Sequence, residues 1–227
     1  MVSFFTHGWI QNSIRSFGKY FPDMKILVVD NNPHYKEQCS EWNWSNNIKT
    51  KWNAYFNFCL AEREWLKNQS NVILLDKEIT TKQTTHGKCM DIALEWCKNN
   101  NKENMLCVEP DNSFSGNAWF HYLSDFLADD KHMVGIKFSD ELSNHIHPCP
   151  ILLKVNEIKW SFNGRHIGKQ YFDCFQWVFH KLRERGKAEL IVENFEGSQG
   201  LGFKHYWSGS YNNFVSNNRN CPMVTFM

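Results

Sequence analysis

The chain has 227 residues, with 25 Lys and Arg against 24 Asp and Glu, and 42% of its residues are hydrophobic. That hydrophobic fraction excludes a disordered chain. The balanced charge argues against a protein held to nucleic acid mainly by phosphate neutralisation. No internal repeat and no Pro/Ser/Gly linker divides the sequence, so we expect a single domain over residues 1–227.

The eight cysteines show no C-x-x-C spacing, which is the strongest sign of a zinc or redox site. Most lie in apolar runs, as Cys107 does, and this favours buried reduced thiols. Residues 1–20 lack the charged start and apolar stretch of a signal peptide. No run of about 18 apolar residues could span a membrane. We therefore expect a soluble, cytoplasmic protein.

The first half of the chain alternates helix and strand patterns. Apolar residues at helical spacing predict helices over 9–20 and 51–67. The continuous apolar runs over 24–30 and 71–76 are typical of buried parallel strands. Such alternation predicts an α/β fold.

The next predicted helix has the clearest boundaries. Thr85 can cap its first turn, and the Asn run at 99–101 ends it. A short strand over 105–109 follows and is broken by Pro110. The helix carries one apolar stripe, made of Met90, Ala93, Leu94 and Cys97.

The second half has a more mixed pattern. We predict strands over 151–155 and 190–192 and a helix over 172–185, while the residues after 210 are polar and weakly patterned. Together the elements predict a mixed, mostly parallel sheet with helices on both faces. Ligands of such sheets bind beyond the carboxyl ends of the strands. The apolar face of the predicted helix consists of Phe175, Val178, Phe179 and Leu182.

Acidic residues follow two of the predicted strands. Asp30 can accept hydrogen bonds from a ribose or a base, or can simply form the turn into Asn31 and Asn32. Glu109 and Asp111 flank Pro110, and both carboxylates can face a hard divalent cation that neutralises a diphosphate. An ordinary Asp-Asn turn would use the same residues.

The start of the helix after Thr85 is a candidate anion site. His86, Gly87 and Lys88 lie where free N–H groups and the helix dipole face a ligand, and Asp91 follows about one turn later. The alternative is a capped helix with an exposed Lys88.

Histidines and a tryptophan in two later segments can also bind ligands. His205 can ligate a metal, and Trp207 can stack on a sugar or base. His145 and His147 can form a ligand pair, line a pocket, or form a turn before Pro148.

Taken together in chain order, these candidate segments resemble GT-A-type glycosyltransferases of the family 2-like group. The resemblance covers about residues 5–210. The strand ending VVDNN is similar to the family's nucleotide-binding strand, and His86-Gly87 with Asp91 and the later acidic turn is similar to its HG…D…DxD run. Glu109 replaces the first Asp of that run. The segment at His205 resembles the one whose His joins the metal.

The resemblance implies a GT-A-like, Rossmann-like fold with a nucleotide-binding half over about 1–111, an acceptor-side half over about 112–210 and a polar tail over 211–227. It implies transfer of a sugar from a nucleoside-diphosphate sugar to a hydroxyl acceptor, with inversion. Mn²⁺ or Mg²⁺ would be held by Asp111 and His205, with Glu109 on the metal or the ribose.

The resemblance also assigns roles to other residues. Asp173 is the candidate base that takes the acceptor proton, with Asp140 and Glu141 as rivals. His145 and His147 would lie on the acceptor side. The donor would be bound by Thr6, Asp30, His86, Gly87, Lys88, Asp91, Glu109 and Trp207.

Three other functions stay open. A nucleotidyltransferase would share the fold, although the Gly-rich basic loop usual near its N-terminus is missing. A carbohydrate-binding module could use the 10 Trp, and a zinc-binding fold could use some of the 8 Cys and 10 His.

The acceptor of a glycosyltransferase could be a protein, a saccharide (lipid-linked or of the cell envelope) or a small molecule. Abundant Asn, Lys and Ile suggest an AT-rich genome such as a phage's, which adds a modified DNA base as acceptor and the host cytoplasm as location.

Overall fold

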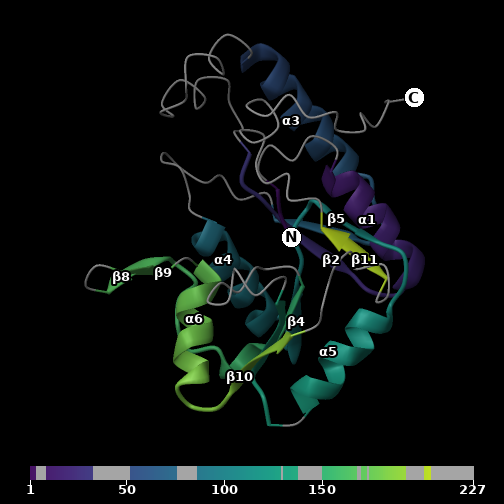
Figure 1. The fold of residues 1–227 in the computed structure, drawn as a ribbon. Helices are drawn as coiled ribbons and strands as arrows, with labels where there is room; N and C mark the ends of the chain where they lie inside the picture. The colour runs from purple at the N-terminus through teal and green to yellow at the C-terminus, as the bar shows by residue number, and fades with distance from the viewer. Residues whose placement is uncertain are drawn as a thin grey trace. The chain divides into compact units, whose positions relative to one another are not determined.

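The computed structural model describes residues 1–3, 9–32, 52–75, 86–128, 130–137, 150–167, 170–172, 174–192 and 202–205 (Figure 1). The chain divides into two compact units. The N-terminal unit comprises Val2–Thr84, Pro110–Ser113 and His205–Met227. The central unit comprises Met1, Thr85–Glu109 and Phe114–Lys204. Both contain helices and strands, which confirms the α/β class; the single domain over 1–227 stays a prediction.

The N-terminal unit contains a three-stranded sheet of order β1-β2-β3 in which both strand pairs are parallel. Its strands are β1 Val2–Ser3, β2 Ile26–Asp30 and β3 Val72–Leu75, and its helices are α1 Trp9–Tyr20 and α3 Trp52–Lys67. The helix predicted over 9–20 coincides with α1, which buries Ile10, Ile14 and Phe17. The parallel strand predicted at 24–30 is also confirmed, with β2 in the middle of the sheet.

Helix α3 buries a face that includes charged residues. Cys59, Glu62, Arg63 and Leu66 are all buried, and their spacing is that of one helix face. Phe58 precedes Cys59 and is 46% exposed, so it is not part of this buried face. The inward positions that a purely apolar stripe would occupy are taken by a Glu and an Arg.

The central unit contains a four-stranded mixed sheet of order β10-β6-β7-β4. Strands β10 and β6 are parallel, and β7 runs antiparallel to both β6 and β4. Helix α5 packs on β6 and β7 and α6 packs on β10, and Figure 1 shows α5 on one side of this sheet with α4 and α6 on the other. The elements are α4 His86–Asn99, β4 Asn104–Cys107, α5 Ala118–Ala128, β6 Met133–Lys137, β7 Ile151–Lys154, a 3-10 turn Val155–Glu157, the hairpin β8 Arg165–Ile167 and β9 Gln170–Phe172, α6 Cys174–Arg183 and β10 Ala188–Val192.

Most predicted elements of the central unit are present with shifted ends. The predicted stripes of α4 and α6 are buried in full. Strands β4, β7 and β10 lie within two residues of the predicted bounds at each end. The sequence did not predict α5, whose apolar residues nearly surround the helix, or the strand β6.

The described cysteines support the expectation of reduced thiols. Cys59, Cys89, Cys97 and Cys107 are free and buried. Burial raises the pKa of the Cys107 thiol to about 12, so this sulfur is protonated and unreactive at neutral pH. Within the described ranges, no helix combines the length and the apolar character that crossing a bilayer requires.

Candidate functional site

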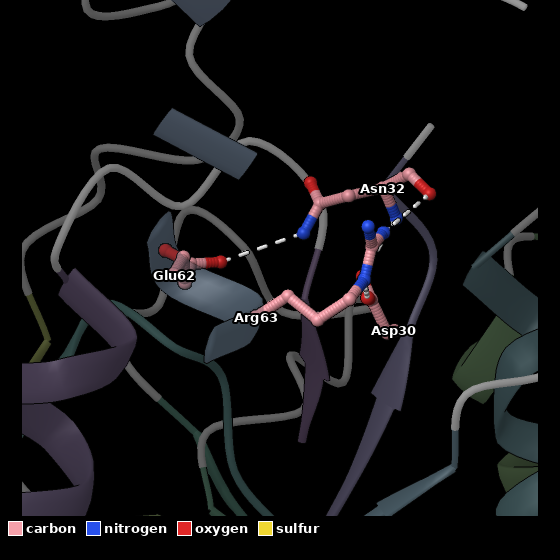
Figure 2. A network of polar contacts seen from close by, with 4 residues as sticks. All are labelled: Asp30, Asn32, Glu62 and Arg63. Carbon is pink, nitrogen blue, oxygen red and sulfur yellow. Dashed lines mark hydrogen bonds and ion pairs between the residues drawn. The ribbon is translucent and has the colours of Figure 1, made fainter. Parts of the chain in front are cut away.

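A buried polar cluster surrounds the turn that follows β2 (Figure 2). Asp30, the last residue of β2, has no exposed surface, and Asn31 and Asn32 are also buried. Oδ1 of Asp30 accepts a hydrogen bond from the backbone N–H of Asn32 at 3.0 Å, which closes the turn. The carboxyl end of β2, the middle strand of its parallel sheet, therefore carries a fixed set of polar groups. This is the place where α/β sheets commonly bind ligands.

Two consecutive residues of α3 hold this turn. Nε of Arg63 donates to Oδ2 of Asp30 at 2.5 Å, and its Nη2 donates to the carbonyl oxygen of Asn32 at 3.4 Å. Oε1 of Glu62 accepts from Nδ2 of Asn32 at 3.4 Å. The predicted strand-end acid thus lies in an ion pair inside the protein, and the sequence did not indicate Glu62 or Arg63 as its partners.

The first two turns of α4 are fastened to the segment 161–163. A Cβ on Gly87 would lie 2.2 Å from the carbonyl oxygen of Phe162 and 2.8 Å from Cα of Asn163, so only glycine fits there. One turn along, Asp91 accepts from Oγ of Ser161 at 2.5 Å and from the backbone N–H of Phe162 at 2.7 Å. Gly87 and Asp91 therefore dock the helix on this segment, whatever ligand they also serve.

The other two residues of the α4 start lie on its exposed side. His86 and Lys88 are exposed, and the His86 ring lies 6.0 Å from the Phe175 ring, edge to face. The predicted contacts of His86, Gly87, Lys88 and Asp91 with a diphosphate or sugar stay predictions.

The strands β5 Asn112–Phe114 and β11 Phe203–His205 form a two-stranded sheet. Gly202, just before β11, accepts hydrogen bonds from the backbone N–H groups of Ser115 at 2.7 Å and Gly116 at 2.9 Å, just after β5. Since the residue before one strand pairs with residues after the other, the two strands run antiparallel. This register sets His205 opposite Asn112, and Asp111 is the next residue along the chain.

The two predicted metal ligands are therefore neighbours in the fold, and both belong to the N-terminal unit. Asp111 is 4% exposed. Of His205 the structure describes the backbone. No three His, Cys, Asp or Glu side chains come together as a metal group among the residues the structure describes. One carboxylate near the backbone of one histidine is a partial donor set for a metal ion.

The predicted site residues fall into three groups. The N-terminal unit holds Asp30, Asp111 and His205, and the central unit holds the α4 start and Glu109, which is partly exposed. Predicted positions outside the described residues are Thr6, Asp140, Glu141, His145, His147, Asp173 and Trp207. The sequence missed Asn32, Glu62, Arg63 and Ser161; the available signal was a Glu-Arg pair at inward positions of a predicted helix.

No family model and no curated protein matches the chain. Among solved structures it is similar to a protein proposed to be a nucleotide-diphospho-sugar transferase from Desulfovibrio desulfuricans G20, with 8% identity, 92% of this chain and 82% of that chain covered, and a TM-score of 0.46. It is also similar to a protein proposed to be a glucose-1-phosphate thymidylyltransferase from Bacillus anthracis, in complex with a sucrose, with 10% identity, 92% and 80% covered, and a TM-score of 0.47. At these values the likeness assigns no residue and no activity to this chain.

Proposed function

We propose that the chain is a GT-A-type glycosyltransferase that moves a sugar from a nucleoside-diphosphate sugar to a hydroxyl acceptor. The observation that carries the proposal is the pairing of β5 with β11. It brings the backbone of His205 opposite Asn112, the residue after Asp111, although Asp111 and His205 are 94 positions apart in the chain (205 − 111). The motif resemblance implies that these two residues belong to one set of metal ligands.

The polar cluster after β2 supports the same proposal. It lies at the carboxyl end of the middle strand of a parallel sheet and contains Asp30, the proposed nucleoside residue. Asp30 uses two acceptor positions, one on each oxygen, out of about four that a carboxylate has. Since Asp30 has no exposed surface, the turn that it closes is the part that would receive a ribose hydroxyl or a base N–H.

We propose a separate role for each of these residues. The turn at Asp30 binds the nucleoside, and Asp111 and His205, with Glu109 on the metal or the ribose, hold Mn²⁺ or Mg²⁺. An ion held there would offset the negative charge of a diphosphate leaving group. For an inverting reaction Asp173 removes the proton of the acceptor hydroxyl. The acceptor is a saccharide, a protein, a small molecule or a modified DNA base.

The first experiment is a calorimetric titration of the protein with the common nucleoside diphosphates, with and without Mn²⁺. We expect one of them to bind in a metal-dependent way, and Asp111→Asn to weaken that binding at least about 10-fold, or about 1.4 kcal/mol. Asp125→Asn is the matched control, since it makes the same change at an exposed residue of α5 and should bind as wild type does.

Product analysis then distinguishes the alternatives. Incubation with radiolabelled nucleotide sugars should release a nucleoside diphosphate. Release of pyrophosphate from a nucleoside triphosphate and a sugar phosphate would instead show a nucleotidyltransferase. Binding of free saccharides with no affinity for any nucleotide would contradict the proposal and favour a carbohydrate-binding module.

A further inference from the structure

Arg63 is a buried cation that the proposed reaction does not use. It lies on α3, 33 residues from Asp30 in the chain, and is 6% exposed. Its ion-pair partner Asp30 has no exposed surface. A buried ion pair costs both partners their hydration and by itself is weak support for stability. The geometry of the pair, by contrast, fixes the turn after β2.

The Arg63 guanidinium contacts both ends of the turn after β2. Its Nε reaches the Asp30 carboxylate at 2.5 Å and its Nη2 reaches the Asn32 carbonyl at 3.4 Å. Two donors in a rigid plane fix the carboxylate and the backbone relative to one another, which a lysine ammonium does less well. Glu62 adds a contact to the side chain of Asn32, so adjacent helix residues hold the turn (Figure 2).

We propose that Arg63 is a positioning residue for the nucleoside: it holds Asp30 and the turn over residues 30–32 in the conformation that receives the nucleoside part of the donor. This inference rests on the proposed function. The charge of Arg63 is already satisfied by Asp30 and buried, which sets it apart from an exposed arginine that binds phosphate. Its loss therefore weakens contacts to the nucleoside and leaves contacts to the diphosphate.

The test compares two ligands on two variants. Nucleoside diphosphate and inorganic pyrophosphate, each with Mn²⁺, are titrated into wild type, Arg63→Lys and Arg63→Met by calorimetry. We expect Arg63→Lys to raise the Kd of the nucleoside diphosphate about 10-fold and to change that of pyrophosphate less than about 2-fold. Arg183→Lys, the same change at an exposed position of α6, is the control and should alter neither.

Arg63→Lys keeps the positive charge, and circular dichroism with a thermal melt confirms that each variant is folded before titration. If Arg63→Met does not fold, Arg63→Lys alone decides. If pyrophosphate does not bind wild type, the free nucleoside takes its place as the second ligand. A loss of affinity for the free nucleoside in Arg63→Lys as large as that for the nucleoside diphosphate then supports the inference, and an unchanged Kd for the free nucleoside overturns it.

Two results would overturn the inference while the proposed function stands. One is an unchanged Kd for the nucleoside diphosphate in folded Arg63→Lys. The other is an equal loss for both ligands, which would indicate a general structural effect or a phosphate contact. Failure of wild type to bind any nucleoside diphosphate would contradict the proposed function, and this inference would fall with it.

Discussion

Two aspartates that the motif resemblance predicts near the sugar donor both make contacts within the protein, but of different kinds. Asp30 is fully buried and paired with a cation, Arg63. Asp91 is partly exposed and accepts hydrogen bonds from neutral donors, the Ser161 hydroxyl and the Phe162 N–H. The first arrangement fixes a turn after a strand, and the second fixes a helix start on a loop.

The difference lies in what each arrangement loses when one partner is removed. A buried carboxylate without its cation keeps a charge that nothing compensates. When a partly exposed carboxylate is removed, water can accept the hydrogen bonds of its former donors, so the loss of stability is smaller. Gly87 belongs to the second arrangement and adds a steric requirement, since it allows the close approach of two backbones.

The largest expected effect is that of Arg63→Met on stability. Removing the cation and leaving the buried Asp30 carboxylate without its partner should lower the free energy of unfolding by about 3–5 kcal/mol, measured by urea denaturation at pH 7. The double variant Asp30→Asn/Arg63→Met should recover a large part of this loss, because it leaves no unpaired charge. If the double variant instead loses as much stability as Asp30→Asn and Arg63→Met lose in sum, the two residues are not coupled.

Gly87→Ala should come next. The added Cβ would meet backbone atoms of Phe162 at 2.2 and 2.7 Å, so α4 or the segment at Phe162 must shift, at a cost of about 1–3 kcal/mol.

Gly18→Ala is the control for this prediction. Its Cβ would meet the flexible side chain of Asn71 at 3.2 Å, and Ala is the better helix former. Stability equal to or above wild type is expected for Gly18→Ala in the same urea denaturation. A Gly87→Ala protein as stable as Gly18→Ala would contradict the close packing of α4.

Asp91→Ala should cost about 1–3 kcal/mol, at or below the effect of Gly87→Ala, because the Phe162 N–H and the Ser161 hydroxyl lose their acceptor. Asp91→Asn keeps one side-chain oxygen and should recover part of this loss. If Asp91→Asn also abolishes binding of the diphosphate without affecting stability, the residue serves the ligand in addition to the helix.

The smallest expected effect is that of Lys187→Met. This change removes the exposed ion pair Lys187–Asp130, which contrasts with the buried pair Asp30–Arg63. Lys187 donates a hydrogen bond to Asp130, which is 80% exposed, and that bond lowers the pKa of the Asp130 carboxyl. Because the pKa is lower in the folded state, the stabilisation is present above the pKa of an unfolded Asp and is lost as pH falls through the folded value. At pH 7 the variant should melt close to wild type, with no remaining difference in strong acid. A large loss at pH 7 would break the contrast between buried and exposed pairs.

Local pattern was sufficient for the helices with one apolar stripe and the strands with a continuous apolar run. The apolar spacing of α1, α4 and α6 identified their buried faces, and the continuous apolar runs identified β2 and β3. It was insufficient for α5, whose apolar residues are not confined to one stripe, and for the three-residue strands β5 and β11. Strands this short form through their partner, and a partner distant in the chain leaves no local pattern.

The sequence by itself determined that the chain folds into α/β units with acidic residues at strand ends, because periodicity and turn chemistry are local properties. It also indicated candidate residues for binding a nucleotide or a cation. Only the tertiary structure decided what those residues contact within the protein. The pairing of Asp30 with Arg63, the docking of Gly87 and Asp91 on residues 161–163, and the register that sets His205 beside Asp111 all join distant parts of the chain. Such contacts follow from packing, which no local pattern encodes.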